Sequence, residues 1–160
     1  MLSVGTHAPD FDLPALGSRR LRLSQALAGK PVVLFFYPKD FTRTCTAEVC
    51  GFRDLYPTLE AMGIALLGIS RDDVATHDRF AARHNVPVEL LTDASGQVCK
   101  AYDARVPILG LPKRVTYLLG PDHRILWAVQ DFTSADAHTE GVLAYIQRQG
   151  LDKAWAAAKA

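Results

Sequence analysis

The chain has 160 residues, of which 49% are hydrophobic and 22% are charged, and this balance predicts one globular domain over residues 1–160. The formal net charge of +1 argues against a nucleic-acid-binding surface, and no apolar run is long enough to span a membrane. No signal peptide is visible, and three cysteines are too few for a secreted disulfide framework. We therefore expect a cytoplasmic protein whose thiols are normally kept reduced.

Apolar runs suited to buried strands alternate with amphipathic stretches, and the expected strands in chain order are residues 32–37, 64–69, 88–91, 115–119 and 125–129. The expected helices are residues 45–60, a segment with Val74, Phe80 and Ala81 on its apolar face, residues 97–102, and a last segment from about Ser134. Turn residues separate these elements. Residues 93–96 form a turn before the third helix, and residues 120–123 join the last two strands as a hairpin.

Three details of the helices are also expected. Pro57 should kink or restart the first helix, because proline cannot donate the backbone hydrogen bond of a helix interior. Ser70 or Asp72 should cap the second helix. The alanine-rich residues 155–160 should either extend the last helix or fray.

The order of elements is typical of an α/β protein with a mixed central sheet and helices on both faces. This order is compatible with a thioredoxin-like fold, and by itself it does not separate that fold from a flavodoxin-like one. The chain contains no internal repeat, low-complexity block or linker that would divide it into several domains.

Residues 38–50 carry the strongest chemical signal. Pro38 ends a strand, Thr42 offers a helix cap, and Cys45 lies in the first turn of the expected helix, where unpaired N–H groups point at the sulfur. A free cysteine titrates at about pH 8.5, and a helix N-terminus with a nearby cation can lower that value. A second cysteine, Cys50, follows five residues later. The arrangement predicts a thiolate that attacks a peroxide oxygen, becomes a sulfenic acid and then forms a disulfide.

Several motifs of the chain resemble those of the peroxiredoxin family, in the family's order. They are Val4-Gly5-x-x-Ala8-Pro9-x-Phe11, Pro38-x-x-x-Thr42-x-x-Cys45, Gly68-Ile69-Ser70-x-Asp72, Leu90-Leu91-x-Asp93 and Arg114-x-Thr116-Tyr117. Cys45-Thr46-x-Glu48-x-Cys50 resembles the Q-type branch, also called bacterioferritin comigratory protein. The resemblance covers nearly the whole chain. It implies a thioredoxin-like fold and a thiol-dependent peroxidase that reduces hydrogen peroxide and alkyl hydroperoxides.

The resemblance implies a role for each matching position. Cys45 would be the peroxidatic cysteine, and Cys50 would be the resolving cysteine. Thr42 would hydrogen-bond the sulfur and the peroxide, and Pro38 would shape and shield the pocket. Arg114 would be the cation that stabilises the thiolate and the transition state.

Other residues near these motifs have less specific expectations. Glu48 would orient polar groups through an arginine, and its alternative is an ordinary solvated helix residue. Cys99 is expected to be a buried thiol, but it is also an alternative resolving cysteine, because some Q-type members place that residue on another helix. Lys39 and Arg43 are expected to be solvated charges.

The spacing of the two cysteines predicts a conformational change. Residues five apart on an α-helix lie about 8–9 Å apart between Cα atoms. A disulfide requires a Cα–Cα separation of about 4.4–6.8 Å. Cys45 and Cys50 therefore cannot bridge on one intact helix, and we expect the first helical turns to unwind on oxidation and refold on reduction.

The resemblance implies that thioredoxin or a similar dithiol protein is the reductant and that the protein is a monomer or weak homodimer. The histidines show no metal-ligand spacing and no phosphate-binding loop is present, so we expect no cofactor or metal. Two other functions stay open. A disulfide oxidoreductase would be expected to have the spacing C-x-x-C rather than C-x-x-x-x-C. A non-catalytic thioredoxin-like binding module would not require Thr42, Cys45 and Arg114 together. The apolar residues 106–112 would either line the peroxide pocket or form a loop.

Overall fold

A mixed five-stranded sheet forms the centre of the fold, with the strand order β5-β4-β3-β6-β7. β3 is parallel to β4, β4 is parallel to β5, and β6 is antiparallel to both of its neighbours. The computed structural model describes residues 1–159. Its strands are β1 (Asp12–Pro14), β2 (Arg20–Arg22), β3 (Val32–Phe36), β4 (Ala65–Ser70), β5 (Glu89–Thr92), β6 (Val115–Leu119) and β7 (Ile125–Gln130).

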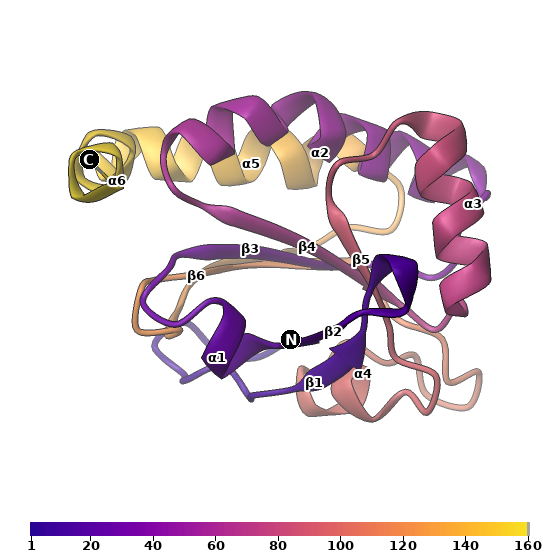
Figure 1. Cartoon of the computed structure of the whole chain (residues 1–160). Coiled ribbons are helices and arrows are strands. Elements are labelled where there is room, and N and C mark those ends of the chain that lie inside the picture. The colour runs from indigo at the N-terminus through magenta and orange to yellow at the C-terminus, as the bar shows by residue number, and fades with distance from the viewer. Residues whose placement is uncertain (160) are drawn as a thin grey trace.

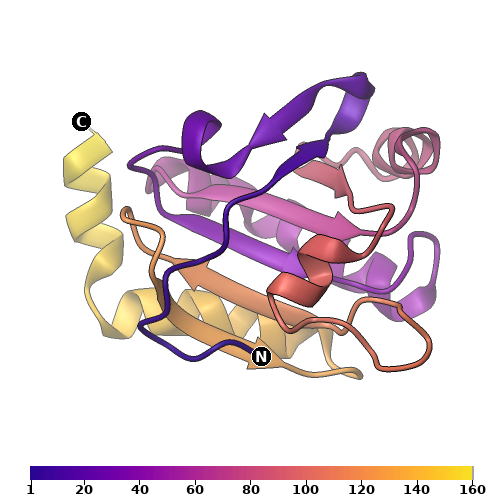
Figure 2. The ribbon, with the colours of Figure 1, turned by 90° about the horizontal axis from the view of Figure 1, so that it is seen from below.

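Helices cover both faces of this sheet. The helices are α1 (Leu23–Ala26), α2 (Arg43–Ala61), α3 (Val74–His84), α4 (Gln97–Ala101), α5 (Ala135–Arg148) and α6 (Leu151–Lys159), and η1 (Leu16–Ser18) is a 3-10 turn. Figure 1 shows α2 beside α5 on one face, with α1, α4 and the β1–β2 hairpin on the other. Figure 2, seen from below, shows α4 and the hairpin in front of the sheet. The predicted mixed sheet with helices on both faces is confirmed.

Alternate residues of β3 supply the two halves of the core, as the two-residue period of a strand requires. Val32, Leu34 and Phe36 pack on the side of α1 and α4. Val33 and Phe35 pack on the side of α2, α3 and α5, and there Phe35 stacks on Phe52 of α2 at a centroid distance of 4.4 Å. This contact fixes the helix that carries Cys45 against the sheet.

The predicted strands agree with the observed ones to within one residue at each end, and the predicted helix over residues 45–60 agrees with α2 to within two. The predicted hairpin between β6 and β7 is also confirmed. α2 continues past Pro57 to Ala61 without a restart, because buried Phe52 and Leu59 hold it to the core on either side of the proline.

Two expectations about helix ends are wrong. Asp73, and neither Ser70 nor Asp72, caps α3, since its Oδ1 accepts a hydrogen bond from the backbone N–H of Thr76 at 2.7 Å. Residues 151–159 neither extend α5 nor fray. They form the separate helix α6 after Gly150, whose φ of 67° ends α5 because only glycine adopts this conformation readily. The expectation for Ala160 falls outside the described residues.

Candidate active site

The register between β3 and β6 brings distant segments to one edge of the sheet. Phe36, the last residue of β3, pairs with Val115, the first residue of β6, in antiparallel register. The loop that follows Phe36 therefore starts beside Arg114, which directly precedes Val115. This juxtaposition explains how an arginine late in the chain reaches the start of α2.

Cys45 lies in the first turn of α2, with 1% of its surface exposed, in the same core cluster as Phe52 and Phe80. The first hydrogen bond of the helix runs from the N–H of Thr46 to the carbonyl of Thr42 at 2.8 Å. The preceding N–H groups of the first turn consequently have no partner within the helix, and they add positive electrostatic potential near the sulfur. All three cysteines are free thiols.

Thr42 occupies the N-cap position of α2, but its side chain does not cap the helix. Its hydroxyl instead donates a hydrogen bond to the carbonyl of Lys39 at 2.8 Å. The oxygen of Thr42 keeps its acceptor capacity toward a molecule that arrives from solvent. Pro38 is half-buried, whereas Lys39 and Arg43 are exposed, as predicted for these two charges.

Arg114 is a buried cation that interacts with the side chains of Glu48 and Cys45. Its Nη1 donates to Oε2 of Glu48 at 2.8 Å, and its Nε donates to the carbonyl of Phe132 at 3.2 Å. Burial lowers the pKa of Arg114, but its interactions with Glu48 and with the sulfur of Cys45 outweigh burial and raise the pKa above its ordinary value. The guanidinium is therefore charged and close enough to Cys45 to stabilise a thiolate.

Glu48 is fully buried on α2, one helical turn after Cys45. Burial raises the pKa of Glu48 from 4.5 to about 7, although the neighbouring Arg114 acts in the opposite direction. Its second oxygen, Oε1, has no hydrogen-bond partner among the described residues and lies 3.7 Å from Nδ1 of His138. The alternative of a solvated helix residue is wrong.

His138 is a buried residue of this site that the sequence analysis does not single out. Its Nε2 donates to the carbonyl of Asp131 at 2.9 Å, and its Nδ1 accepts from the hydroxyl of Thr116 at 2.7 Å. Burial lowers the pKa of His138, and the charge of Arg114 acts in the same direction. His138 shares the buried stripe of α5 with Val142 and Ile146, and this spacing of four residues is the sequence signal that could have found it.

Cys50 is half-buried and lies on the same intact helix as Cys45, about one and a half turns away. Cys99 is fully buried on α4, in the core cluster on the opposite face of the sheet. Burial raises the pKa of Cys99 far above its ordinary value, and the carboxylate of Asp93 adds to this effect. Cys50 therefore shares a helix with Cys45, whereas Cys99 lies on the other side of the sheet.

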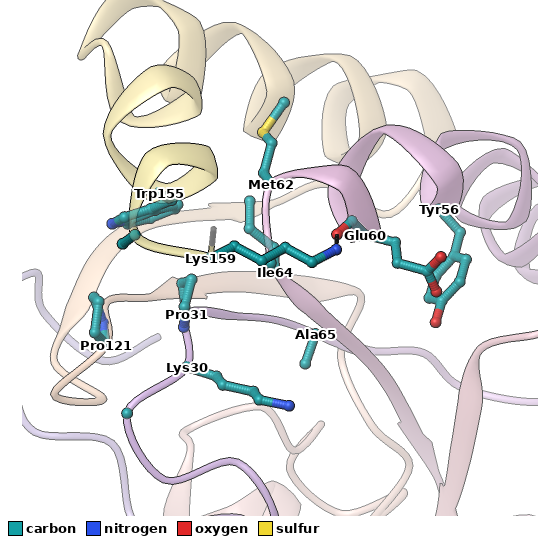
Figure 3. A pocket seen from close by; sticks show the side chains of 13 residues that line it. Lys30, Pro31, Tyr56, Glu60, Met62, Ile64, Ala65, Pro121, Trp155 and Lys159 are labelled. Carbon is teal, nitrogen blue, oxygen red and sulfur yellow. Dashed lines mark hydrogen bonds between the residues drawn. The ribbon is translucent and has the colours of Figure 1, made fainter.

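A cavity of about 500 Å³ lies at the other end of the sheet (Figure 3). Its walls come from the end of α2, from α6 and from the loops before β3 and after β6, and they include Lys30, Glu60 and Trp155. The amino group of Lys159 donates to the carbonyl of Glu60 at 2.6 Å across its rim. None of the predicted site residues lines this cavity. Residues 106–112, for which the sequence leaves open a place in the peroxide pocket or a loop, form a loop between α4 and β6 in which Ile108 and Leu109 are exposed.

Comparisons with known proteins identify the family. A model described as the AhpC/TSA family matches residues 4–128. A bcp-type peroxiredoxin of Coxiella burnetii is 38% identical over 148 residues, which cover 89% of this chain and 97% of the relative. Peroxidoxin BcpB of Mycobacterium tuberculosis has a structure with a TM-score of 0.86 at 35% identity, over 92% of this chain and 98% of its own. The bacterioferritin comigratory protein of Xanthomonas campestris gives 0.79 at 31% identity, over 87% and 91%.

The fold and these relatives define the class of thioredoxin-fold peroxidases. The chain belongs to the AhpC/TSA family and, within it, to the Q-type peroxiredoxins, which are thiol-dependent peroxidases. In residues 1–159, no helix combines the length and the apolar character needed to cross a membrane.

Proposed function

We propose that Cys45 is the peroxidatic cysteine of this peroxidase and that Cys50 is its resolving cysteine. One observation carries the proposal: Cys45 is buried at the start of α2 beside the charged guanidinium of Arg114. A helix N-terminus and a cation are the two features that favour a thiolate over a thiol. Cys99 differs from Cys45, because burial and the carboxylate of Asp93 outweigh the charge of Arg71 and raise the pKa of the Cys99 thiol far above its ordinary value.

The reaction begins when the thiolate of Cys45 attacks the terminal oxygen of a hydroperoxide. A sulfur–oxygen bond forms as the oxygen–oxygen bond breaks, so sulfur is oxidised to a sulfenic acid, and the leaving oxygen takes up a proton to form water or an alcohol. The thiol of Cys50 then displaces hydroxide from the sulfenic acid, and a disulfide and water result. A dithiol reductant returns both cysteines to thiols by disulfide exchange.

The other site residues stabilise this chemistry. Arg114 donates to the thiolate and to the negative charge that develops on the peroxide oxygens, and Glu48 orients the guanidinium through the 2.8 Å hydrogen bond. The hydroxyl oxygen of Thr42 accepts a hydrogen bond from the O–H group of the peroxide, since its own hydrogen is donated to the carbonyl of Lys39. Pro38 is half-buried at the start of this loop and shields the pocket from water.

Hydrogen peroxide and alkyl hydroperoxides are the proposed substrates, in line with the alkyl peroxide reduction activity of the Xanthomonas campestris relative. Thioredoxin or a similar dithiol protein is the proposed reductant. We further propose that residues 1–160 are one domain, that the protein acts as a monomer or weak homodimer, and that it works in the cytoplasm.

Thiol counting and peptide mapping test the two cysteine assignments. Reduced wild type treated with one equivalent of hydrogen peroxide should lose two thiols and yield a Cys45–Cys50 disulfide. Cys50→Ser should lose one thiol and retain a sulfenic acid on Cys45 that dimedone traps. Cys99→Ser, the matched control, should behave as wild type.

Two results would contradict the assignments. Rapid peroxide consumption by Cys45→Ser would show that another residue reacts first. A Cys45–Cys99 link in oxidised wild type would transfer the resolving role to Cys99. Steady-state turnover with thioredoxin and its reductase tests the reductant, and failure to turn over despite stoichiometric thiol loss would exclude thioredoxin alone.

A further inference from the structure

A polar cluster, buried except for the half-buried Asp72, lies beside the segment that leads into α2, and the proposed reaction does not use it. Its members are Tyr37, Asp40, Ser70, Asp72 and His77. The side chains of Asp40 and His77 are 0% and 1% exposed. Asp40 stands between β3 and Cys45, whereas His77 comes from α3. Placing ionisable groups in a core costs free energy unless they are paired, so this pairing calls for an explanation.

Both ring nitrogens of His77 make hydrogen bonds. Nε2 faces the carbonyl of Leu91 at 3.2 Å, and a carbonyl only accepts, so Nε2 carries a hydrogen. Nδ1 lies 2.5 Å from Oδ2 of Asp40, a distance that requires a shared proton. The hydroxyl of Tyr37 donates to Oδ1 of the same carboxylate at 2.6 Å. Asp40 and His77 thus form a buried hydrogen-bonded pair that ties the catalytic loop, residues 37–42 between β3 and α2, to α3 and β5.

The backbone of the loop is held at the same point. The N–H of Asp40 donates to Oδ2 of Asp72 at 2.9 Å, and Ser70 donates to that oxygen at 2.6 Å. Both partners lie at or just after the end of β4, which runs beside β3. The side chain of Asp40 is therefore fixed to α3, and its main chain is fixed to the end of β4.

Asp40, Asp72 and His77 have ligand atoms within 4.8 Å of one another, which also suggests a cation site. The hydrogen bonds argue against it. Nδ1 of His77 and Oδ2 of Asp40 face each other at 2.5 Å and leave no room for an ion between them, and Oδ2 of Asp72 already accepts two hydrogens. The cluster satisfies its own polar groups.

The residue after this anchor is strained. Phe41 has a φ of 64°, which is uncommon for a bulky residue, and its ring packs edge-on against Phe80 of α3 at 5.1 Å. Thr42 and α2 follow directly. Backbone strain of this kind persists only where neighbouring contacts impose it, and the fixed position of Asp40 is such a contact.

We propose that Asp40 and His77 are positioning residues, whose buried pair holds the catalytic loop so that Thr42 and Cys45 meet the peroxide. The pair also sets the N-terminal limit of the segment that unwinds on oxidation, so the chain opens after Asp40 and not before it. This inference rests on the proposed function, because it assumes that Cys45 is the reacting residue. Neither residue touches the substrate.

Two substitutions of His77 separate positioning from plain stability. The side-chain nitrogen of asparagine replaces Nδ1, and that of glutamine replaces Nε2. His77→Asn therefore keeps a donor to Asp40, and His77→Gln keeps only the donor to Leu91. Both remove part of a buried ring and should lower the melting temperature by similar amounts.

The rate constant for Cys45 oxidation by hydrogen peroxide, measured by stopped flow on folded protein, is the deciding readout. His77→Gln should lose at least about tenfold, since a displacement of an ångström at a reacting group costs this much or more. His77→Asn should stay within about threefold of wild type. Equal rates in the two variants, whether both high or both low, would overturn the proposal.

A measurement on wild type applies even if the variants do not fold. The proton between His77 and Asp40 should appear far downfield in the NMR spectrum, coupled to Nδ1, and it should persist after Cys45 and Cys50 form their disulfide. Loss of this proton on oxidation, or a stoichiometric metal ion in the purified protein, would overturn the proposal. Failure of wild-type Cys45 to react with peroxide would instead overturn the proposed function.

Discussion

Arg114 interacts with two buried side chains, the carboxyl group of Glu48 and the sulfur of Cys45. Glu48 has an unpaired oxygen and a pKa of about 7, so the net charge of the pair changes near neutral pH. Because the pKa in the folded state is higher than 4.5, the folded protein binds this proton more tightly than the unfolded chain. The contribution of this proton to the free energy of unfolding is complete below about pH 4.5 and is lost as the pH rises through 7.

Glu48→Gln should therefore remove a pH dependence of stability. Between pH 5 and pH 8, the free energy of unfolding of wild type should fall by about 2–3 kcal/mol more than that of Glu48→Gln. Urea unfolding at both pH values measures the difference, with Glu140→Gln, on the exposed face of α5, as the control for loss of one carboxylate. Parallel pH profiles for wild type and Glu48→Gln would show that Glu48 does not titrate in this range.

Cys99 offers a second prediction about a single residue. Its side chain is fully buried and its pKa is raised well above the ordinary value, so little thiolate is available to a reagent. In native reduced protein, iodoacetamide should modify Cys99 at least about a hundred times more slowly than Cys50, and the two rates should become equal in urea. Comparable rates in native protein would mean that α4 opens readily.

The element that presents Cys45 depends on a glycine in β4. A Cβ at Gly68 would lie 2.7 Å from Cζ of Phe35, and Phe35 is the residue that stacks on Phe52 of α2. The missing side chain at position 68 thus leaves the space that Phe35 needs to hold α2.

Gly68→Ala should destabilise the protein by about 1–3 kcal/mol through overpacking. Thermal or urea unfolding measures the loss. In a Phe35→Leu background, Gly68→Ala should lower the free energy of unfolding by less, because leucine vacates the space that the new methyl group enters. An equal loss of stability in that background would show that Phe35 is not the residue with which the new methyl group clashes.

The elements that sequence patterns predict well are those with long apolar runs or clear periodicity. β3, β4 and β6 are such runs, and the periodicity of α2 defines its inward face. The hairpin of β1 and β2 is missed because each strand has three residues and Arg20 and Arg22 give it no apolar run. The division between α5 and α6 depends on the positive φ of Gly150, which hydrophobic periodicity does not report.

Some residues of the candidate site could be predicted from the sequence, and others are brought together only by the fold. Thr42, Cys45 and Cys50 belong to one segment, so local spacing could predict them. The pairing of Glu48 with Arg114 arises from the antiparallel register of β3 and β6, which only the folded sheet defines. The sequence predicts no role for Asp40 and His77, because their partners come from separate elements. The position of His77 three residues before buried Phe80 was nevertheless a signal that it faces the core.

Across the whole molecule, the candidate active site and the helix α6 lie at opposite ends of the sheet. The surroundings of Cys45 follow the end of β3, whereas α6 and the cavity in Figure 3 adjoin its beginning. Trp155, 9% exposed, belongs to the same core cluster as Phe35 and joins α6 to the rest of that face.

Trp155→Ala should lower the free energy of unfolding by about 3 kcal/mol, as expected for removal of a large buried ring. The rate of Cys45 oxidation should stay within about twofold of wild type, since the ring lies far from the catalytic end. Trp155→Phe, which keeps most of the packing, should lose less stability. A large loss of peroxide reactivity in folded Trp155→Ala would show that the two ends are coupled.

Amide hydrogen exchange tests most directly whether the start of α2 unwinds when Cys45 and Cys50 are oxidised. Reduced protein and protein oxidised with one equivalent of hydrogen peroxide are compared over residues 41–52, after peptide mapping has identified the disulfide. The Cys45–Cys50 spacing on an intact helix is about 8–9 Å, too long for a bridge, so oxidation should raise exchange in this segment markedly. A Cys45–Cys50 disulfide with equal protection in both states would contradict the account.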